Sequence, residues 1–221
     1  MNLASFIDHT LLKSSCTANE VDKLCKEAIQ YNFAAVCIPP VYVVHAVEEL
    51  KNDPVKIATV IGFPFGYTYI RAKVEEAKQA IDDGADELDM VMNITAFKNY
   101  DFIYLEKEVS AVLKITKKHN VLLKIIIESG LLNNDEIISC CKFFKSFDID
   151  FLKTSTGYAE KGATVETVQL MRHNLPSCIK IKASGGIRTT DFAIQLINAG
   201  AERLGCSASV AIVVGQAGKD S

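Results

Sequence analysis

Short apolar runs alternate with longer amphipathic stretches along the whole chain. Eight such runs are separated by polar or glycine-containing segments. Parallel strands joined by helical crossovers produce this alternation, and eight strand-helix units are the number that closes a (β/α)₈ barrel. The predicted strands are Phe6–Thr10, Ala34–Ile38, Ile57–Ile61, Leu88–Met92, Leu122–Ile127, Phe151–Lys153, Ile179–Lys182 and Arg203–Gly205.

The stretches between these runs carry helix start and stop signals. Thr17-Ala18-Asn19-Glu20 has the form of a capping box, and Pro39 and Pro40 can open a helix. Gly84 and Gly200 stand where a helix needs a left-handed residue after its last turn. The 221 residues suit one barrel of about 200–250 residues, so we expect a single domain over residues 1–221.

The first run gives the weakest prediction of a strand, because it is brief and follows only a few residues. A doubly wound open sheet is therefore the alternative fold. That fold favours a G-x-G-x-x-G turn after an early strand. The sequence has no such turn. The barrel is therefore the preferred prediction.

Two lysines end predicted strands, where a strongly hydrated side chain is unusual. Lys153 closes the sixth run and Lys182 the seventh, and in a barrel these strands are neighbours. Asp89 lies in the fourth run between Leu88 and Met90, so the two-residue period of a strand turns its carboxylate inward. Active sites of such barrels lie at the carboxyl ends of the strands. The alternative is that both lysines extend to solvent as ordinary surface side chains.

Two neighbouring amines have a chemical use. An amine attacks a carbonyl only when neutral, and a lysine of ordinary pKa, about 10.4, is neutral less than ~0.1% of the time at pH 7. A second ammonium about 6 Å away lowers that pKa by roughly two units, and burial can supply the rest. We therefore expect Lys153 to form an imine with a carbonyl substrate, Lys182 to lower its pKa, and Asp89 to transfer protons.

Glycines and a serine follow the last two runs, where barrels often bind phosphate. Gly185 and Gly186 follow the seventh run, while Gly205 and Ser207 lie at the end of the eighth. Glycine lets the backbone approach an anion, and helix N-terminal amides donate to it. Tight strand-to-helix turns would give the same pattern without a ligand.

Composition excludes several other classes of function. A net charge of −3 gives no basic field for nucleic acid, and no apolar run approaches a membrane span of about 18 residues. The seven cysteines lack C-x-x-C spacing and the four histidines form no paired motif, so we expect reduced thiols, no metal and a cytoplasmic protein.

At this stage the motifs resemble those of the deoxyribose-phosphate aldolase family over almost the whole chain and in the expected order. The segments that carry the resemblance begin at Ile7, Gly62, Glu87, Lys153, Lys182 and Arg203, and read IDHTLLK, GFPFG, ELDMVMN, KTSTGY, KASGGIR and RLG.

The resemblance implies a metal-independent class I aldolase that cleaves 2-deoxy-D-ribose 5-phosphate into acetaldehyde and D-glyceraldehyde 3-phosphate. It gives Lys153 the Schiff-base role, Lys182 the perturbing role and Asp89 the proton-transfer role. It also implies deoxynucleoside breakdown and, by analogy alone, a homodimer. Phosphate is expected to be held by Gly157, Gly185, Gly186, Gly205 and Ser207, with Asp8 and Thr10 lining the pocket.

Some features depart from the family pattern. Ala208 stands where some relatives carry a second serine, and Gly218–Ser221 lack the C-terminal tyrosine of some members. Lys180 shares its strand face with Lys182, which leaves it either inside the barrel with a carboxylate or at the bottom mouth. Two other functions remain open at this stage: a Schiff-base aldolase for a ketose phosphate, and a catalytically silent phosphate-binding barrel.

Overall fold

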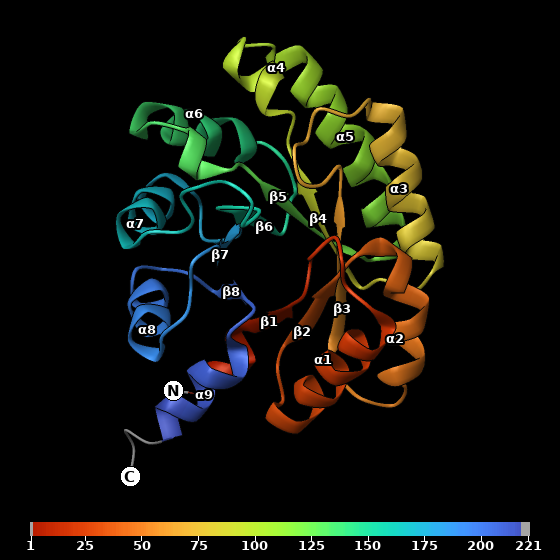
Figure 1. Cartoon of the computed structure of the whole chain (residues 1–221). Helices are drawn as coiled ribbons and strands as arrows, with labels where there is room; N and C mark the ends of the chain where they lie inside the picture. The colour runs from red at the N-terminus through yellow and green to blue at the C-terminus, as the bar shows by residue number, and fades with distance from the viewer. Residues whose placement is uncertain (1, 218–221) are drawn as a thin grey trace.

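A computed structural model describes residues 2–217, and the C-terminal stretch Gly218–Ser221 lies outside the described residues. Eight parallel strands form a closed barrel in chain order, with β1 paired to both β2 and β8 (Figure 1). This closure confirms the predicted (β/α)₈ barrel and excludes the open sheet. The strands are β1 Ile7–Thr10, β2 Ala35–Ile38, β3 Lys56–Ile61, β4 Glu87–Val91, β5 Leu122–Ile126, β6 Phe151–Lys153, β7 Lys180–Ser184 and β8 Arg203–Cys206.

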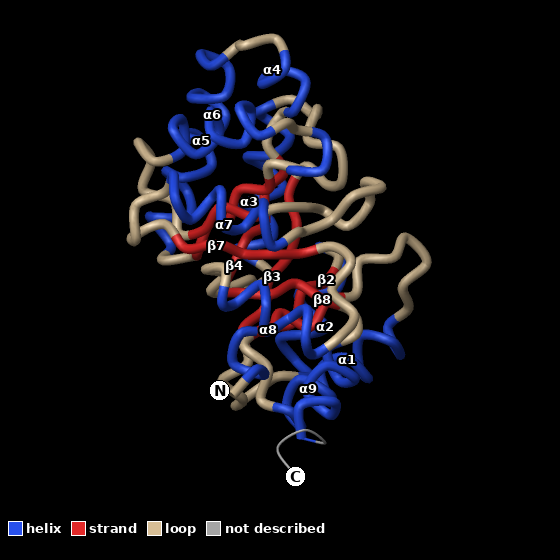
Figure 2. Tube along the Cα trace, turned by 90° about the vertical axis from the view of Figure 1, so that its left-hand side faces the viewer, coloured by secondary structure: helices blue, strands red, loops and turns tan. Residues whose placement is uncertain are grey.

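Helices surround the strands as an outer layer, visible as blue tube around the red strands in Figure 2. Short 3₁₀ turns lie at Leu3–Phe6 before β1, at Pro40–Tyr42 before α2 and at Ser129–Leu131 after β5. The helices are α1 Ala18–Tyr31, α2 Val43–Glu49, α3 Ile70–Asp82, α4 Ile94–Lys98, α5 Phe102–His119, α6 Asn134–Phe144, α7 Val165–Asn174, α8 Thr190–Asn198 and α9 Ser209–Ala217.

The predicted helix ends are confirmed. Glu20 accepts a hydrogen bond from the backbone N–H of Thr17 at 2.9 Å, which forms the capping box of α1. Pro40 begins the 3₁₀ turn that leads into α2. Gly84 and Gly200 follow α3 and α8 with φ of +104° and +113°, a region open to glycine because it has no Cβ.

Strand alternation separates two layers with opposite chemistry. Leu88 and Met90 of β4 face the helices and belong to the large apolar cluster between barrel and helices. The intervening Glu87 and Asp89 are buried in the lumen, where they meet charged side chains of other strands. The helix-facing layer therefore supplies most of the hydrophobic stabilisation, and the lumen is free to hold costly charges.

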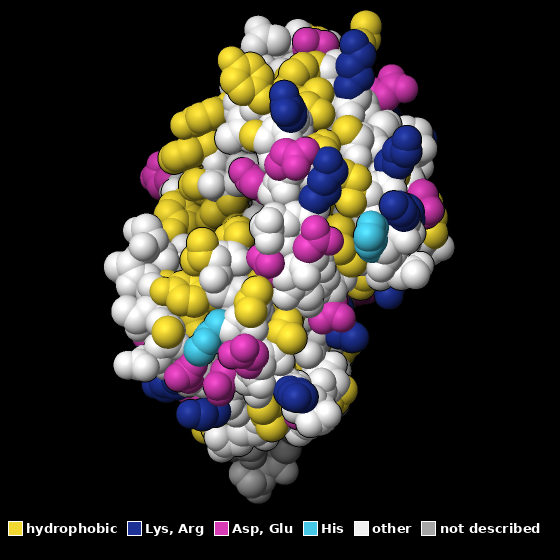
Figure 3. Space-filling model, turned by 90° about the vertical axis from the view of Figure 1, so that its right-hand side faces the viewer, with side chains coloured by type: hydrophobic (Ala, Val, Ile, Leu, Met, Phe, Trp, Pro, Cys, Tyr) yellow, Lys and Arg dark blue, Asp and Glu magenta, His cyan; other side chains and the backbone are white. Residues whose placement is uncertain are grey.

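The outer surface is mixed in charge. Figure 3 shows acidic and basic side chains interspersed over the flank formed by α2, α3 and α5, in keeping with the small net charge. Between residues 2 and 217, no helix combines the length and apolar character that crossing a bilayer requires. All seven cysteines are free, as expected from their spacing.

Leu88→Ala tests the role of the helix-facing layer. Leu88 is fully buried, so its truncation should lower the free energy of unfolding by about 2–5 kcal/mol, measured by urea denaturation. Val41→Ala is the matched control, because Val41 is 83% exposed and its loss should change stability by less than about 0.5 kcal/mol. Equal losses in the two variants would contradict the layer assignment.

Candidate active site

Three predicted residues meet inside the barrel at a single carboxylate oxygen. Oδ2 of Asp89 accepts hydrogen bonds from Nζ of Lys153 at 2.7 Å and from Nζ of Lys182 at 2.6 Å. Lys153 is 2% exposed, and the other two are fully buried. The strand register explains the meeting, because Lys153 of β6 lies directly beside Lys182 of β7.

A third lysine, Lys124 of β5, completes the environment of Asp89. Its Nζ lies 2.7 Å from Oδ1 of Asp89, the oxygen that the other two lysines leave free. It also forms an ion pair with Glu87 and lies 3.7 Å from Asp8. Both oxygens of Asp89 are thus held by cations, which fixes the orientation of the carboxylate.

Arg203 and Asp8 close this set of ion pairs. Nη1 of Arg203 lies 2.6 Å from Oδ1 of Asp8 and 3.2 Å from Oε2 of Glu87, while Oδ2 of Asp8 accepts from Lys182. We call the seven linked side chains the charge network. Within residues 2–217 it holds three carboxylates and four cationic groups: Asp8, Glu87, Asp89, Lys124, Lys153, Lys182 and Arg203.

Burial lowers the pKa of Lys153 in this network, and the positive charge of Lys182 lowers it further. Asp89 acts in the opposite direction without reversing the shift. Two ammonium groups about 5 Å apart, at an effective dielectric near 20, repel each other by roughly 3 kcal/mol, or about two pKa units. Burial is the larger cause, so Lys182 contributes to the shift without being its main source.

The pKa values of the groups around Lys153 are shifted in the direction that keeps those groups charged. Asp8 and Asp89 outweigh the effect of burial on Lys182 and raise its pKa above that of an ordinary lysine. Lysines hold the pKa of Asp89 well below its usual range, and Lys182 and Arg203 do the same for Asp8, in both cases against burial. Lys153 is therefore the lysine most readily deprotonated beside Asp89.

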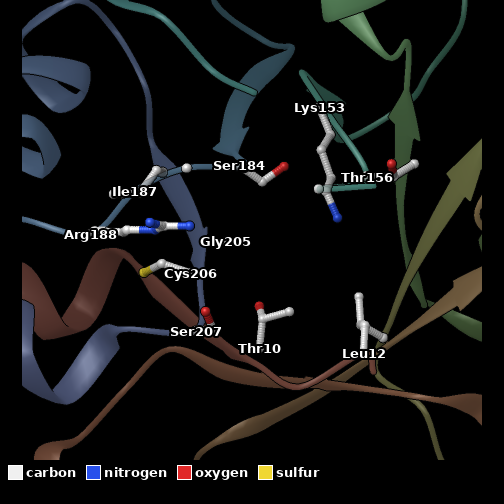
Figure 4. Close-up of a pocket in the computed structure, with 13 residues that line it drawn as sticks. Thr10, Leu12, Lys153, Thr156, Ser184, Ile187, Arg188, Gly205, Cys206 and Ser207 are labelled. Carbon is white, nitrogen blue, oxygen red and sulfur yellow. The ribbon is translucent and has the colours of Figure 1, made fainter. Parts of the chain in front are cut away.

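A cavity of about 210 Å³ opens above Lys153, whose amine points into it in Figure 4. This volume is smaller than the roughly 300–1,000 Å³ of sites for drug-sized ligands, so it suits a small molecule. Its walls come from loops after four consecutive strands, β6, β7, β8 and β1. The lining residues are Thr10, Leu12, Lys153, Thr156, Gly157, Ser184, Gly185, Gly186, Ile187, Arg188, Gly205, Cys206 and Ser207.

The wall after β7 and β8 has the chemistry of an anion site. Gly185 and Gly186 adopt φ of +89° and +79°, which a side chain would strain. Figure 4 shows the guanidinium of Arg188 directed toward the cavity from the side opposite Leu12. Glycine-rich turns with an arginine favour phosphate.

Comparison with known proteins agrees with this geometry. Residues 3–214 match the model of the DeoC/LacD family aldolase. The chain belongs to this family. A deoxyribose-phosphate aldolase of Caldicellulosiruptor saccharolyticus is 48% identical over 96% of both chains. A Coccidioides immitis structure, provisionally described as a deoxyribose-phosphate aldolase, superposes with a TM-score of 0.94, 42% identity and coverage of 98% and 86%. The deoxyribose phosphate aldolase of Aeropyrum pernix, described as tetrameric, superposes with a TM-score of 0.90 and 32% identity. The match covers 97% of this chain and 91% of that one.

The aldolase cavity brings together most of the residues predicted from sequence. Thr10 lines it, as do the five residues expected to hold phosphate. Asp8 is not among the lining residues of this cavity. Asp8 faces the lumen one strand period below Thr10, and its carboxylate is fully buried against Lys182 and Arg203.

Three basic side chains had no role assigned from the sequence: Lys124, Arg188 and Lys180. Lys124 of β5 forms ion pairs with Glu87 and Asp89 of the neighbouring strand β4, a pairing across strands. Arg188 stood inside a quoted motif without a role. Lys180 lies at the bottom mouth, exposed, with its Nζ 5.7 Å from the ring of Phe151.

Cys37 lies within electrostatic reach of Lys153, Lys182 and Asp89, whereas one group of possible metal ligands lies outside the site. The Cys37 thiol is fully buried in a small apolar cluster with Ala58 and Val60, and burial raises its pKa. Ligand atoms of Asp22, His45 and Glu49 lie within 4.8 Å of one another. That group belongs to the outer helices α1 and α2 and contributes nothing to the lysine site.

The lowered pKa of Lys153 predicts a specific dependence of stability on pH. Between its folded pKa and about 10.4, the unfolded chain binds more protons at this site than the folded chain does, so stability rises with pH. The free energy of unfolding of the wild type should therefore rise relative to that of Lys153→Met, which has no titrating group there. Urea denaturation from about pH 7 to about pH 10 measures the difference. A difference that falls with pH would mean that the pKa of Lys153 is raised.

Proposed function

We propose that this aldolase reversibly cleaves 2-deoxy-D-ribose 5-phosphate into acetaldehyde and D-glyceraldehyde 3-phosphate through an imine on Lys153. The observation that carries the proposal is the shared oxygen of Asp89, which holds two lysines of opposite pKa shift beneath a small cavity with an anion-binding wall. The names of the relatives agree with this substrate.

The two lysines take different roles. Lys153 lines the cavity, and its lowered pKa increases the neutral fraction that can attack a carbonyl. Lys182 is fully buried beneath it, with a raised pKa, and remains an ammonium between Asp8 and Asp89. Lys153 is thus the nucleophile, and Lys182 is a fixed charge that disfavours a proton on Lys153.

Imine formation begins when Nζ of Lys153 attacks the C1 aldehyde of the open-chain sugar. The carbinolamine that results loses water to give a protonated imine. Asp89 begins as a carboxylate because its pKa is low, so it takes a proton from the attacking nitrogen and returns it to the carbinolamine oxygen. A second proton, taken up from solvent, lets the hydroxyl leave as water and leaves the imine positively charged.

Bond cleavage follows from the positive charge of the imine. The C3 hydroxyl loses its proton to Asp89 through a water, the C2–C3 bond breaks, and its electron pair moves into the imine to form an enamine. D-Glyceraldehyde 3-phosphate leaves. The enamine carbon then takes up a proton, and water hydrolyses the imine to release acetaldehyde and restore the Lys153 amine.

The phosphate is held at the far wall by Gly157, Gly185, Gly186, Gly205 and Ser207, with Arg188 as an added cation. Binding there fixes C1 against Lys153 and C3 near Asp89, so that remote binding energy positions the reacting bond.

The imine supplies the electron sink, so the proposed reaction requires no metal or other cofactor. We place the enzyme in the cytoplasm, acting on small phosphorylated sugars and aldehydes in deoxynucleoside breakdown. We also propose a homodimer. The Aeropyrum pernix relative is described as a tetramer, so sedimentation analysis should be used to distinguish a dimer from a tetramer.

Trapping with borohydride tests the nucleophile. Acetaldehyde and borohydride should add one ethyl group to the wild type, seen by intact mass, and none to Lys153→Ala, which should also lose turnover. Lys182→Leu should be trapped slowly, with its pH profile moved to higher pH, because loss of the ammonium raises the pKa of Lys153.

A silent phosphate-binding barrel would gain no mass in any variant. Labelling of Lys153→Ala at the wild-type rate would assign the imine to another lysine. Cleavage of a ketose phosphate in preference to deoxyribose phosphate would contradict the proposed substrate.

Asp89→Asn tests proton transfer separately from imine formation. The amide cannot accept a proton as the carboxylate does, so kcat for cleavage should fall by about 10²–10⁴-fold. The imine with acetaldehyde should form more slowly, because Asp89 also transfers a proton in that step, but it should still be trapped. Turnover at the wild-type rate would limit Asp89 to a structural role.

A further inference from the structure

Tyr158 bridges Leu12 and Thr156, two residues that line the substrate cavity. The cavity walls come from the loops after β6, β7, β8 and β1, which leaves the side facing the loops after β2, β3, β4 and β5. The hydroxyl of Tyr158, in the loop after β6, donates to the carbonyl oxygen of Leu12, in the loop after β1, at 2.7 Å. Leu12 and Thr156 lie on the same side of the cavity in Figure 4, so this bond runs along the side that the strands leave open.

A second cavity of about 300 Å³ lies against the same wall. It shares Thr156 with the substrate cavity, and Tyr158 is among its own lining residues. This second cavity is apolar, unlike the polar wall after β7 and β8 of the substrate cavity, because aromatic and aliphatic residues dominate its lining. They include Pro64, Phe65, Tyr67, Ile94, Leu131 and Ala159.

The wall is held in place from both ends. The ring of Tyr158 packs edge-on against Phe63, with ring centroids 5.4 Å apart. Its backbone N–H donates to Oγ1 of Thr156 at 3.0 Å, and Thr156 in turn donates to the carboxylate of Glu128. Glu128 is 3% exposed and adopts a left-handed backbone with φ of 49°, a conformation that a non-glycine residue keeps only when its surroundings fix it.

We propose that Tyr158 is a specificity-determining residue that separates the polar substrate cavity from the apolar cavity. While the ring is in place, the acceptor aldehyde is confined to the polar side. Without it the two spaces join, and the apolar cavity takes the alkyl chain of a longer, unphosphorylated aldehyde. This inference rests on the proposed aldolase function, because it assumes that an acceptor aldehyde meets an enamine on Lys153.

Addition of acetaldehyde to propanal and to hexanal tests the wall. In Tyr158→Ala the ratio of kcat/KM for hexanal to that for propanal should rise at least about tenfold over the wild type, since several methylenes gain an apolar site. Tyr158→Phe keeps the ring and loses only the bond to Leu12, so its rise should be smaller. Tyr158 is 53% exposed, so these substitutions leave the core intact.

Tyr69→Ala is the matched control, because Tyr69 is an 85% exposed tyrosine that lines neither cavity, and its ratio should stay at the wild-type value. An unchanged ratio in Tyr158→Ala overturns the inference, as does an equal rise in Tyr69→Ala. If the ratio rose as much in Tyr158→Phe as in Tyr158→Ala, the ring of Tyr158 would not be what separates the two cavities.

Borohydride trapping of acetaldehyde in the same variants separates the two proposals. If the wild type forms no adduct, the aldolase function itself fails. If all variants form the adduct and the ratios are equal, only the role of Tyr158 fails.

Discussion

One carboxylate oxygen between two buried amines is the interaction on which the site depends. Oδ2 of Asp89 contacts both Lys153 and Lys182, so the two nitrogens are held closer together than two ammonium groups would settle in water. The carboxylate stabilises a proton on either lysine, and Asp8 adds its own attraction only for Lys182. The proton is therefore favoured on Lys182, and Lys153 is the amine that loses it.

Charge balance explains why the remaining members of the network are present. With Lys153 neutral, Lys124, Lys182 and Arg203 match the three carboxylates of the lumen in number. A proton on Lys153 would add an unmatched charge in a buried space, which is costly. The protonated imine carries that same unmatched charge. The network therefore favours the conversion of the protonated imine into the neutral enamine. This account gives Lys124 a part in the chemistry without contact with the substrate.

The barrel permits this arrangement because the outer face of its sheet packs against the helices, while the inner face holds the charged side chains. Apolar residues between strands and helices hold the fold together, as Leu88 and Met90 illustrate. Closure of the sheet brings β1 and β4 near β6 and β7 through the lumen, although they lie far apart in sequence. The helix-facing layer offsets the cost of the charges inside.

The strand pattern predicted much of this site, because two-residue alternation shows which side chains face inward. It was enough for Lys153, Lys182 and Asp89. It could not give depth or cross-strand register, which depend on the tilt of strands in the closed barrel. For that reason the strand pattern did not show that Asp8 lies beneath the cavity against Lys182, or that Lys124 pairs with carboxylates of β4. Tyr158 ends the motif KTSTGY but had no role assigned, because its contact with Leu12 joins two loops that are far apart in the sequence.

The protonation state of Lys153 is the most direct test of this account. Nζ of Lys153 can be followed by NMR in protein labelled with ¹⁵N-lysine, and assigned by its absence from the Lys153→Met spectrum. The account predicts that Lys153 titrates below the ordinary value of about 10.4, while Lys182 stays protonated throughout the titration. A Lys153 that keeps its proton above that value, or loses it after Lys182, would contradict the central claim.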